Sequence, residues 1–492
     1  MIPLSPGQRV HLIGIAGTGM GALAGLLQEA GFRVSGSDEE IYPPISTLLA
    51  ELRIPVLPGY RASNLEPGGP NPAPDLVVIG NAISRGNPEL EAVLDAKLPY
   101  ASLPETLREL FLRGRETVVV AGTHGKTTVS SILAWIFHSA GLDPGFLIGG
   151  LPSNFPRSFA HGSGEHFIVE GDEYDTAFFD KGPKFLHYRP DALVLTSVEF
   201  DHADIYPDLA AVQTAFKRLV NLIPRRGIIL AWAGSETVRE CCSRAFCPVE
   251  TFGFEKGDWQ AKNLRCQGET TIFAVQVRGE PLGLLTTSLS GEHNVSNVLA
   301  AAAMVSHYGI SWDQIQEAVR TFRGVRRRME IVGEAGGVIV VDDFAHHPTA
   351  IRETLRAARA RFAGQRLWVL LEPRSNTLRR NILERELIEA LAHADRVVIA
   401  EVYRKDRVPA AERLEPARVV ASLRDTGMPA DLGGDADSIA EFLLPQLQPG
   451  DVVLAMSNGA FGGIHQKLLA GLTWRAAGNP VSPGFSVPQR QP

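Results

Sequence analysis

The chain has 492 residues, a length that at roughly 100–200 residues per domain predicts three domains. With 45% hydrophobic and 21% charged residues it has the composition of a soluble globular protein, which excludes a largely disordered or collagen-like chain. The net charge of −7 argues against a nucleic-acid partner, and no apolar run approaches the ~20 residues of a membrane span. We therefore expect a cytoplasmic protein without a membrane partner, and the sequence indicates no obligate protein partner.

The first unit, residues 1–115, opens with the pattern of a nucleotide-binding fold. A strand over 9–15 is followed by a helix over 22–30 and strands over 32–35 and 75–80, with a glycine cluster at Gly14, Gly17, Gly19 and Gly21. Strand, glycine turn, helix and strand begin a doubly wound, Rossmann-like parallel sheet. The glycine spacing is not the G-x-G-x-x-G of a dinucleotide site, which argues against a nicotinamide oxidoreductase.

The second unit, residues 116–324, contains a phosphate-binding loop. Gly122-Thr-His-Gly-Lys-Thr-Thr128 separates a buried strand over 117–121 from a helix over 129–140. Backbone N–H groups and a helix N-terminus favour phosphate at such a junction, Lys126 can reach the β- and γ-phosphates, and Thr127 can hold Mg²⁺. The usual pattern has a glycine where this chain has Val120, so a tight turn that binds nothing is the alternative.

Acidic and histidine residues follow two further strands of this unit. Glu170 comes first after a strand over 166–169, and His202 lies in the Glu199–Asp204 segment after a strand over 192–198. Because ligands of open α/β sheets bind beyond the carboxyl ends of the strands, both segments should face the phosphate loop. A solvated rim is the alternative, and for Asp172, Asp175 and Asp204 both interpretations stay open.

Two polar motifs mark the end of the second unit. Asn294 and Asn297 lie one turn apart where a helix begins, so their amides could read a purine edge; a helix-capping role for Asn294 is compatible with this. Arg326–Arg328 form a positive block at a domain junction, where arginine could stabilise a transferring phosphoryl group. A solvated linker is the alternative for the arginines.

The third unit, residues 325–475, again alternates strands and helices. We expect strands over 337–341, 367–371, 396–400 and 451–456 and helices over 349–360 and 383–392, which predicts a second Rossmann-like parallel sheet. The proline-containing tail over 476–492 is expected to be disordered. The fold class is therefore α/β, with three domains that each have a mostly parallel sheet flanked by helices, and with the phosphate loop in the central one.

The motifs together resemble one known family. GTHGKTT, VEGDEYD, FDHAD, GEHNVSN, RRRME and DDFAHHP occur in this order and are similar to the Mur ligases, ATP-dependent enzymes that form amide bonds in cell-wall assembly. The resemblance covers about residues 8–472. Segments such as YPPISTLL, GNAISRGNPE, EYDTAFFDK and LEPRSNT favour the branch that joins UDP-N-acetylmuramate to the tripeptide L-alanyl-γ-D-glutamyl-meso-diaminopimelate in peptidoglycan recycling.

The resemblance implies which residues act, with ATP and Mg²⁺ as cofactors. For UDP-N-acetylmuramate it implies Gly17, Gly19, Ser37, Asp38 and Asn81. For ATP it implies Gly122, Thr123, His124, Gly125, Lys126, Thr127, Thr128, His293, Asn294, Asn297, Arg327 and Asp343. For magnesium it implies Thr127, Glu170 and His202, and for the tripeptide His346 and Arg374. Lys126, His202, Arg327 and His346 are the implied catalytic residues; Lys217, near the place of a carbamylated lysine in some family members, is not included.

The resemblance also implies a reaction through an acyl phosphate, in which the lactyl carboxylate attacks the γ-phosphorus of ATP and a peptide amine then displaces phosphate. The alternative within the family is the ligase that adds L-alanine. Phe344 and Glu372-Pro-Arg-Ser-Asn depart from the pattern of that branch and favour the tripeptide. Outside the family, an ATPase or kinase that forms no amide and a nucleotide sensor without turnover remain alternatives.

Overall fold

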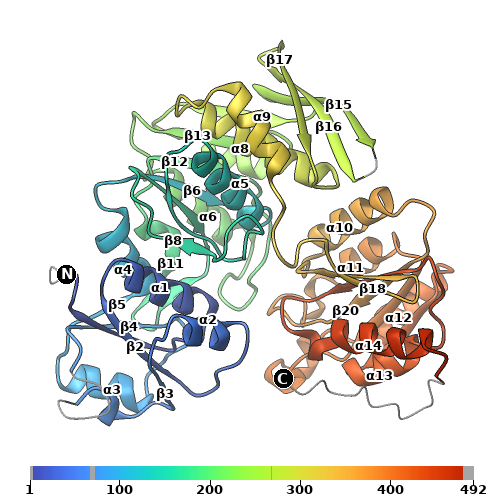
Figure 1. Cartoon of the computed structure of the whole chain (residues 1–492), viewed down its shortest axis with the longest axis horizontal. Coiled ribbons are helices and arrows are strands. Elements are labelled where there is room, and N and C mark those ends of the chain that lie inside the picture. The colour runs from blue at the N-terminus through green and yellow to red at the C-terminus, as the bar shows by residue number, and fades with distance from the viewer. Residues whose placement is uncertain (1–3, 67–72, 268, 480–492) are drawn as a thin grey trace.

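The computed structural model describes residues 4–66, 73–267 and 269–479 and confirms three α/β domains in chain order (Figure 1). Helices of the described residues are all too short or too polar to cross a membrane. The last helix ends at Ala476, and most of the predicted disordered tail, residues 480–492, lies outside the described residues.

The N-terminal domain is a five-stranded, fully parallel sheet of order β3-β2-β1-β4-β5. Its strands are β1 (Arg9–Ile13), β2 (Arg33–Asp38), β3 (Val56–Pro58), β4 (Leu76–Ile79) and β5 (Tyr100–Ser102). Its helices are α1 (Thr18–Glu29), α2 (Ile45–Glu51), α3 (Pro88–Asp95) and α4 (Leu103–Leu107). The central strands are apolar and buried on both faces, as a parallel sheet covered by helices requires.

The limits of α1 and β2 differ from the prediction, and β3, β5, α2, α3 and α4 were not among the predicted elements. Helix α1 begins at Thr18, a turn earlier than expected, because its glycines are needed for close packing: a Cβ on Gly21 would lie 2.8 Å from Ile45. Strand β2 continues to Asp38, three residues further than expected. Ser37 therefore lies inside the sheet and is fully buried.

The central domain is a ten-stranded sheet of order β17-β16-β15-β14-β13-β12-β6-β9-β7-β8. Its strands are β6 (Glu116–Ala121), β7 (Gly145–Leu147), β8 (Phe159–Ala160), β9 (His166–Gly171), β12 (Ala192–Leu195), β13 (Ile228–Trp232), β14 (Val249–Gly253), β15 (Trp259–Gln267), β16 (Thr270–Val277) and β17 (Glu280–Thr287). Its helices are α5 (Lys126–Ser139), α6 (Leu209–Val220), α7 (Glu236–Cys242), α8 (Glu292–Ser306) and α9 (Trp312–Thr321). Strand β6 pairs in parallel with β9 and β12, so the carboxyl ends of all three meet beside the phosphate loop.

Three elements of the central domain begin or end at other residues than predicted, and this changes where the candidate site residues lie in the fold. Strand β9 extends to Gly171, so Glu170 lies within the strand and not after it. Strand β12 ends at Leu195, which leaves Thr196–Asp204 as a connecting loop. Helix α8 begins at Glu292 with Gly291 as its N-cap, so Asn294 lies inside the helix. The proposed N-cap role of Asn294 is therefore wrong.

The C-terminal domain has a six-stranded sheet of order β18-β19-β23-β20-β21-β22, in which only the β18–β19 pair is antiparallel. Its strands are β18 (Glu330–Ala335), β19 (Val338–Asp343), β20 (Leu367–Leu371), β21 (Arg396–Ala400), β22 (Ala430–Gly434) and β23 (Val452–Met456). Its helices are α10 (Pro348–Arg361), α11 (Glu384–Leu391), α12 (Pro416–Asp425), α13 (Ala436–Leu443) and α14 (Ile464–Ala476). Helices α12, α13 and α14 were not among the predicted elements.

Aromatic side chains of the central domain take part in two of the contacts between the N-terminal and central domains. The hairpin of β10 (Asp175–Ala177) and β11 (Asp180–Pro183) carries Phe178 and Phe179 at its tip, and Phe179 lies edge-on to Tyr100 with ring centroids 5.3 Å apart. On the other side of the contact, the ring of Phe159 lies against Gly25 of α1. A Cβ on Gly25 would lie 2.1 Å from that ring, so glycine is required there by space.

We predict that Gly25→Ala destabilises the protein by about 1–3 kcal/mol, because the added methyl group overpacks the contact with Phe159. In an unconstrained helix the same change would stabilise by up to about 1 kcal/mol. Thermal unfolding measures the effect. The double variant Gly25→Ala/Phe159→Leu should recover most of the loss, and a single variant as stable as the wild type would contradict the prediction.

Candidate active site

The phosphate loop joins β6 to α5 in a conformation that needs glycine. Gly122 has φ +134° and Gly125 has φ +81°, both in the region that L side chains rarely adopt. A Cβ on Gly125 would lie 2.6 Å from the Asn297 Oδ1, so the close approach of α8 to the loop also requires glycine at this position. The predicted strand–loop–helix junction is confirmed, and its backbone N–H groups begin a 14-residue helix.

The ammonium of Lys126 lies over the loop and is paired with Glu173. Its Nζ is 2.9 Å from the Glu173 Oε2 and 2.6 Å from the Gly122 carbonyl oxygen. Burial disfavours both charges, but the nearby carboxylates raise the pKa of Lys126, and Lys126 with His202 lowers the pKa of Glu173. Both groups are therefore charged at neutral pH, and the cation is held where phosphate oxygens would meet the loop.

Thr127 and Glu170 present oxygen atoms beside this lysine. The Thr127 hydroxyl donates to Glu170 Oε1 at 3.1 Å, and the Gly149 N–H donates to Glu170 Oε2 at 2.8 Å. Burial raises the pKa of Glu170, and the nearby charge of Lys126 offsets only part of this effect. A hydroxyl and a carboxylate at the end of a strand are hard oxygen donors, and this donor set fits Mg²⁺.

His202 lies on the far side of the same pair. Its Nε2 is 3.2 Å from the Glu173 Oε1, its ring lies edge-on to Tyr174, and its backbone has φ +55°. Burial lowers and the bond to Glu173 raises the pKa of His202, with a net increase. The predicted grouping of Lys126, Glu170 and His202 is thus found in the structure, with Glu173 linking Lys126 to His202.

A cavity of about 390 Å³ opens from the phosphate loop between the central and C-terminal domains. Twenty-three residues of both domains line it, among them these predicted residues: His124, Gly125, Thr127, Thr128, His293, Asn294, Asn297 and Asp343. The Asn297 amide donates to the Asn294 Oδ1 at 3.2 Å, and the Asn294 amide donates to the Ser290 carbonyl. Trp232 and Phe254 add an aromatic wall, so the cavity combines flat apolar surface with amides, as an adenine base requires.

Two arginines of the block at the domain junction, Arg327 and Arg328, have different surroundings. Arg328 lines the nucleotide cavity, and its guanidinium lies over the ring of Phe344, with 5.0 Å between Cζ and the ring centroid. Arg327, the predicted residue, turns to the C-terminal domain instead: it donates to Asp342 and to the carbonyl oxygens of Ser457 and Gly459. The structure therefore brings Arg328 to the nucleotide cavity and Arg327 to the domain junction.

Asp343 connects the linker to this cavity. One carboxylate oxygen accepts from the Met329 N–H and the other from the Ala345 N–H, each at 2.8 Å. The side chain is buried, and burial raises its pKa. Asp343 thus fixes the chain directly after Arg328, which holds that guanidinium toward the nucleotide cavity.

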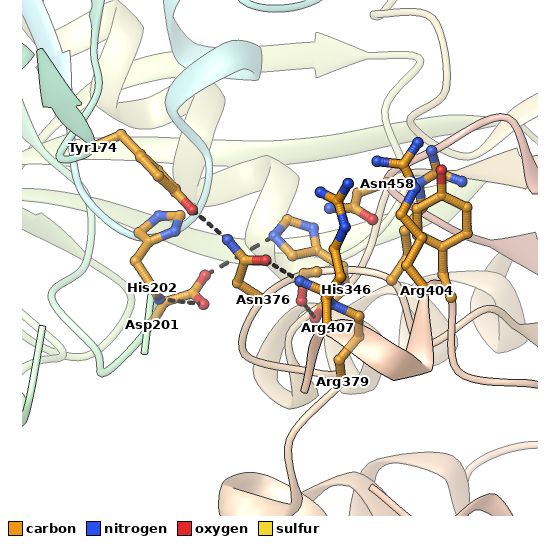
Figure 2. Close-up of a pocket in the computed structure, with 12 residues that line it drawn as sticks. Tyr174, Asp201, His202, His346, Asn376, Arg379, Arg404, Arg407 and Asn458 are labelled. Carbon is orange, nitrogen blue, oxygen red and sulfur yellow. Dashed lines mark hydrogen bonds and ion pairs between the residues drawn. The ribbon is translucent and has the colours of Figure 1, made fainter. Parts of the chain in front are cut away.

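A second cavity of about 300 Å³ lies next to His202 on the C-terminal side (Figure 2). His346 and Arg374, both predicted to face the incoming substrate, line it, together with Arg379, Arg404 and Arg407. The His346 Nδ1 lies 3.0 Å from the Phe344 carbonyl oxygen, which can only accept, so Nδ1 carries the proton and Nε2 keeps its lone pair. Burial lowers the pKa of His346, which keeps the ring neutral.

The loop after β12 is where the C-terminal domain docks. Thr377 donates to the Asp201 carboxylate at 2.5 Å, and Thr349 donates to Glu199 at 2.7 Å. The Asn376 amide lies 2.7 Å from the Asp204 Oδ2 and 2.7 Å from the Tyr174 hydroxyl, the latter contact being visible in Figure 2. Asp204, for which two interpretations were open, is therefore a docking residue. Asp172 and Asp175 pair with Lys184 and Lys181.

His124, Glu199 and His347 form a cluster at this docking surface. Their ligand atoms lie within 4.8 Å of one another, which is close enough for a metal ion. However, the His347 Nε2 faces the Phe200 carbonyl oxygen at 3.2 Å, and its Nδ1 accepts from the Thr349 N–H at the start of α10. Both ring nitrogens of His347 are used, so we interpret the cluster as a contact between domains.

The predicted substrate residues of the N-terminal domain differ in their exposure to solvent. Gly17 and Gly19 are exposed at the start of α1, and Asn81 is half-buried directly after β4. Asp38 accepts from the Ala16 N–H at 2.9 Å and so fixes the glycine turn. Ser37 donates to the buried Glu89 at 2.7 Å, and this bond points its hydroxyl into the domain interior.

Sequence reasoning did not single out Glu173, Arg328, Asn376 or the arginines after β21. Glu173 stands in a run of four acidic residues, Glu170 to Asp175, and only the hairpin that follows shows which one turns inward. Lys217, which was left out of the predicted site, lines a separate cavity with Glu240 and Cys241 that shares no residue with the two described above.

Comparison with known families matches all three domains. Residues 9–115 match the Mur ligase family catalytic domain, residues 120–305 the Mur ligase middle domain, and residues 327–459 the Mur ligase glutamate ligase domain. The chain is 44% identical over 473 residues to the UDP-N-acetylmuramate–L-alanyl-γ-D-glutamyl-meso-2,6-diaminoheptandioate ligase of Escherichia coli, which covers 95% of this chain and 99% of that protein.

Two further relatives represent the two kinds of ligase that the sequence motifs resemble. The UDP-N-acetylmuramate–L-alanine ligase of Oleidesulfovibrio alaskensis is 34% identical, with 94% of this chain and 98% of that protein covered. The crystal structure of a murein peptide ligase from Psychrobacter arcticus is 37% identical, with a TM-score of 0.72 and coverage of 95% of this chain and 99% of that chain. Both likenesses span all three domains of this chain.

The buried histidines predict a dependence of stability on pH. Burial lowers the pKa of His293 to about 4, below the ordinary 6.5. Between pH 6.5 and pH 4, this imidazole is therefore protonated in the unfolded chain and neutral in the folded protein. Stability should therefore fall as the pH falls from 6.5 toward 4, by up to about 1.4 kcal/mol per pH unit for this residue. His347, also lowered to about 4, adds to the same trend.

Urea unfolding at several pH values between 6.5 and 4.5 measures this trend. His293→Gln should reduce the slope by about one proton relative to the wild type. Circular dichroism at pH 7.5 checks that the variant is folded. Equal slopes for the two proteins would contradict the prediction.

Proposed function

The chain belongs to the Mur ligase family, and from that premise we propose that it is the ATP-dependent ligase that joins UDP-N-acetylmuramate to L-alanyl-γ-D-glutamyl-meso-diaminopimelate in peptidoglycan recycling. One observation carries the proposal: near-full-length identity of 44% to the ligase of that name from Escherichia coli. The reaction forms a C–N bond at the expense of ATP. We propose that it takes place in the cytoplasm, where ATP and nucleotide sugars occur.

The geometry supports an order of substrates along the interdomain space. The phosphate loop and the nucleotide cavity suit ATP, with its γ-phosphate toward Lys126 and His202. The arginine-lined cavity begins at His202 and extends into the C-terminal domain, which suits an anionic peptide. The N-terminal glycine turn, with Gly17 and Gly19 exposed, suits the diphosphate of the nucleotide sugar.

A free carboxylate does not react with an amine at neutral pH, so the acid must be activated. In the proposed first step, a carboxylate oxygen of UDP-N-acetylmuramate attacks the γ-phosphorus of ATP, the bond from that phosphorus to the β,γ-bridging oxygen breaks, and ADP leaves with the electron pair. Lys126 and Arg328 would neutralise the charge that is shared among the phosphoryl oxygens. Bound at Thr127, Glu170 and His202, Mg²⁺ would supply further charge neutralisation.

In the proposed second step, the amine of the tripeptide attacks the acyl carbon and phosphate leaves with the electron pair of the C–O bond. The attacking nitrogen must lose a proton. His346 lines the cavity where the amine would arrive, and its unprotonated Nε2, 3.9 Å from the Asp201 Oδ2, can accept that proton. The docked C-terminal domain covers this space, and excluding water protects the acyl phosphate from hydrolysis.

We predict the product of a direct assay. Purified protein is incubated with ATP, Mg²⁺ and UDP-N-acetylmuramate, together with either the tripeptide or L-alanine, and the products are identified by mass. We expect the UDP-N-acetylmuramyl tripeptide, and with hydroxylamine in place of an amine we expect a hydroxamate of the sugar acid. The L-alanine adduct alone would support the other branch, and ADP without an adduct would support an ATPase.

We predict that Lys126→Met lowers kcat for amide formation by about 10³-fold, because one preorganised charge on the phosphoryl oxygens is removed. Glu173→Gln should lower kcat by about 10²-fold, since Lys126 and His202 lose the carboxylate that positions both. Steady-state release of ADP in the presence of the tripeptide measures both variants.

The matched control is Lys181→Met, which removes an exposed lysine that pairs with Asp175 on the nearby hairpin. This control should stay within about threefold of the wild type. Full activity of Lys126→Met would contradict the proposed role of the phosphate loop.

A further inference from the structure

The cavity next to His202 has an outer wall that the reaction steps above do not use. Three arginines form it: Arg379 from the segment after β20, and Arg404 and Arg407 from the segment between β21 and α12, which we call the arginine loop (residues 401–407). Figure 2 shows these guanidinium groups on the C-terminal side, across the cavity from Tyr174 and His202.

Among the described residues, the two arginines of the arginine loop have no charged partner. Within the described residues, neither the Arg404 nor the Arg407 guanidinium has an ion pair or a hydrogen bond, whereas Lys405 between them pairs with Glu401. Arg404 has φ +48° and Arg407 closes a turn back to it through its backbone N–H. Tyr403 of the same loop lies under Arg374, with 3.7 Å from the Arg374 Cζ to the ring centroid.

Two buried atoms in this wall lack partners among the described residues. They are the Nε of Arg379 and the Oδ1 of Asn458, and both residues line the cavity. The other end of the Arg379 guanidinium donates to Asn376, the residue that contacts Tyr174 across the domain boundary. Arg379 is therefore held by domain docking, and its Nε–H has no partner among the described residues.

The charges around the cavity are strongly unbalanced. Four arginines line it, against one carboxylate, and that carboxylate, Asp201, already accepts from Thr377. Burial and the neighbouring positive charges of Arg380 and Arg407 lower the pKa of Arg379, which records the mutual repulsion. A ligand with several carboxylates would relieve this repulsion, and guanidinium groups bind carboxylates with paired hydrogen bonds.

The tripeptide of the proposed function has that chemistry. Linkage through the γ-carboxyl leaves the α-carboxylate of its glutamate free, and diaminopimelate carries two more, so three carboxylates follow the reacting amine. A lysine in the third position would carry one carboxylate fewer, and L-alanine carries only one in total. The number of carboxylates thus distinguishes the three acceptors.

We propose that Arg404 and Arg407 bind the carboxylates of the third residue of the tripeptide and select diaminopimelate over lysine at that position. Arg379 is held through Asn376 at the domain boundary, where the glutamate carboxylate would pass. This inference rests on the proposed function. It assigns the arginine loop to substrate selection and not to the chemical steps.

The test compares KM for two peptides, one ending in diaminopimelate and one ending in lysine. Arg404→Gln and Arg407→Gln should each raise KM for the diaminopimelate peptide by about tenfold. The double variant should no longer distinguish the two peptides. The kcat at saturating peptide and the KM values for ATP and UDP-N-acetylmuramate should stay within about threefold of the wild type, as should every constant of the control Lys405→Gln.

Arg404→Lys should recover only part of the affinity, because an ammonium group cannot make the paired hydrogen bonds. A double variant that keeps the wild-type KM and preference, while the wild type ligates the tripeptide, would overturn this inference alone. A wild type that forms no tripeptide adduct would overturn the proposed function and this inference together. Thermal unfolding of each variant confirms that a changed KM does not reflect unfolding.

Discussion

The ion pair of Lys126 and Glu173 organises the centre of the molecule. Lys126 is the first residue of α5, which follows β6, and Glu173 lies in the loop after β9; the two meet because β6 and β9 are parallel neighbours. Glu173 also holds His202 from the loop after β12, so one carboxylate fixes three strand ends. Removing one member of such a buried pair lowers the free energy of unfolding by about 3–5 kcal/mol. The relative positions of these side chains are therefore strongly constrained.

The loop after β12 shows how one segment can serve two purposes. His202, whose backbone is left-handed, turns toward the phosphate loop. Asp201 and Asp204 face the C-terminal domain and accept hydrogen bonds from Thr377 and Asn376. Catalytic and docking residues therefore alternate within four positions. A shift of the C-terminal domain would pull directly on the backbone that carries His202, which couples domain closure to the geometry of the phosphate site.

Much of the fold and the centre of the site could be predicted from the sequence, because the signals are local. Gly125, Lys126 and Thr127 follow a buried strand, and the rule that ligands bind at the carboxyl ends of parallel strands brings Glu170 and His202 to them. What could not be predicted depends on tertiary geometry. Three consecutive arginines look alike in sequence, and only the positive φ of Arg327 and Met329, together with the bonds from Asp343, sends Arg328 toward the nucleotide cavity.

The same limit explains why the arginine loop was missed and why its position matters. Arg404 and Arg407 lie about 30 residues beyond Arg374 in a segment without a motif, and they reach the same cavity because β20 and β21 are parallel neighbours whose carboxyl ends meet. In a parallel sheet, each additional strand end can contribute a side chain further from the reacting centre. The C-terminal sheet, in which β20 lies between β19 and β21, thus brings side chains from three strand ends to one cavity: His346 after β19, Arg374 after β20, and the arginine loop after β21. A peptide bound in this cavity would place its amine at His346 while the arginines hold its far end. Recognition of the third residue would then be separate from the chemistry at the first, which allows specificity to change without loss of catalysis.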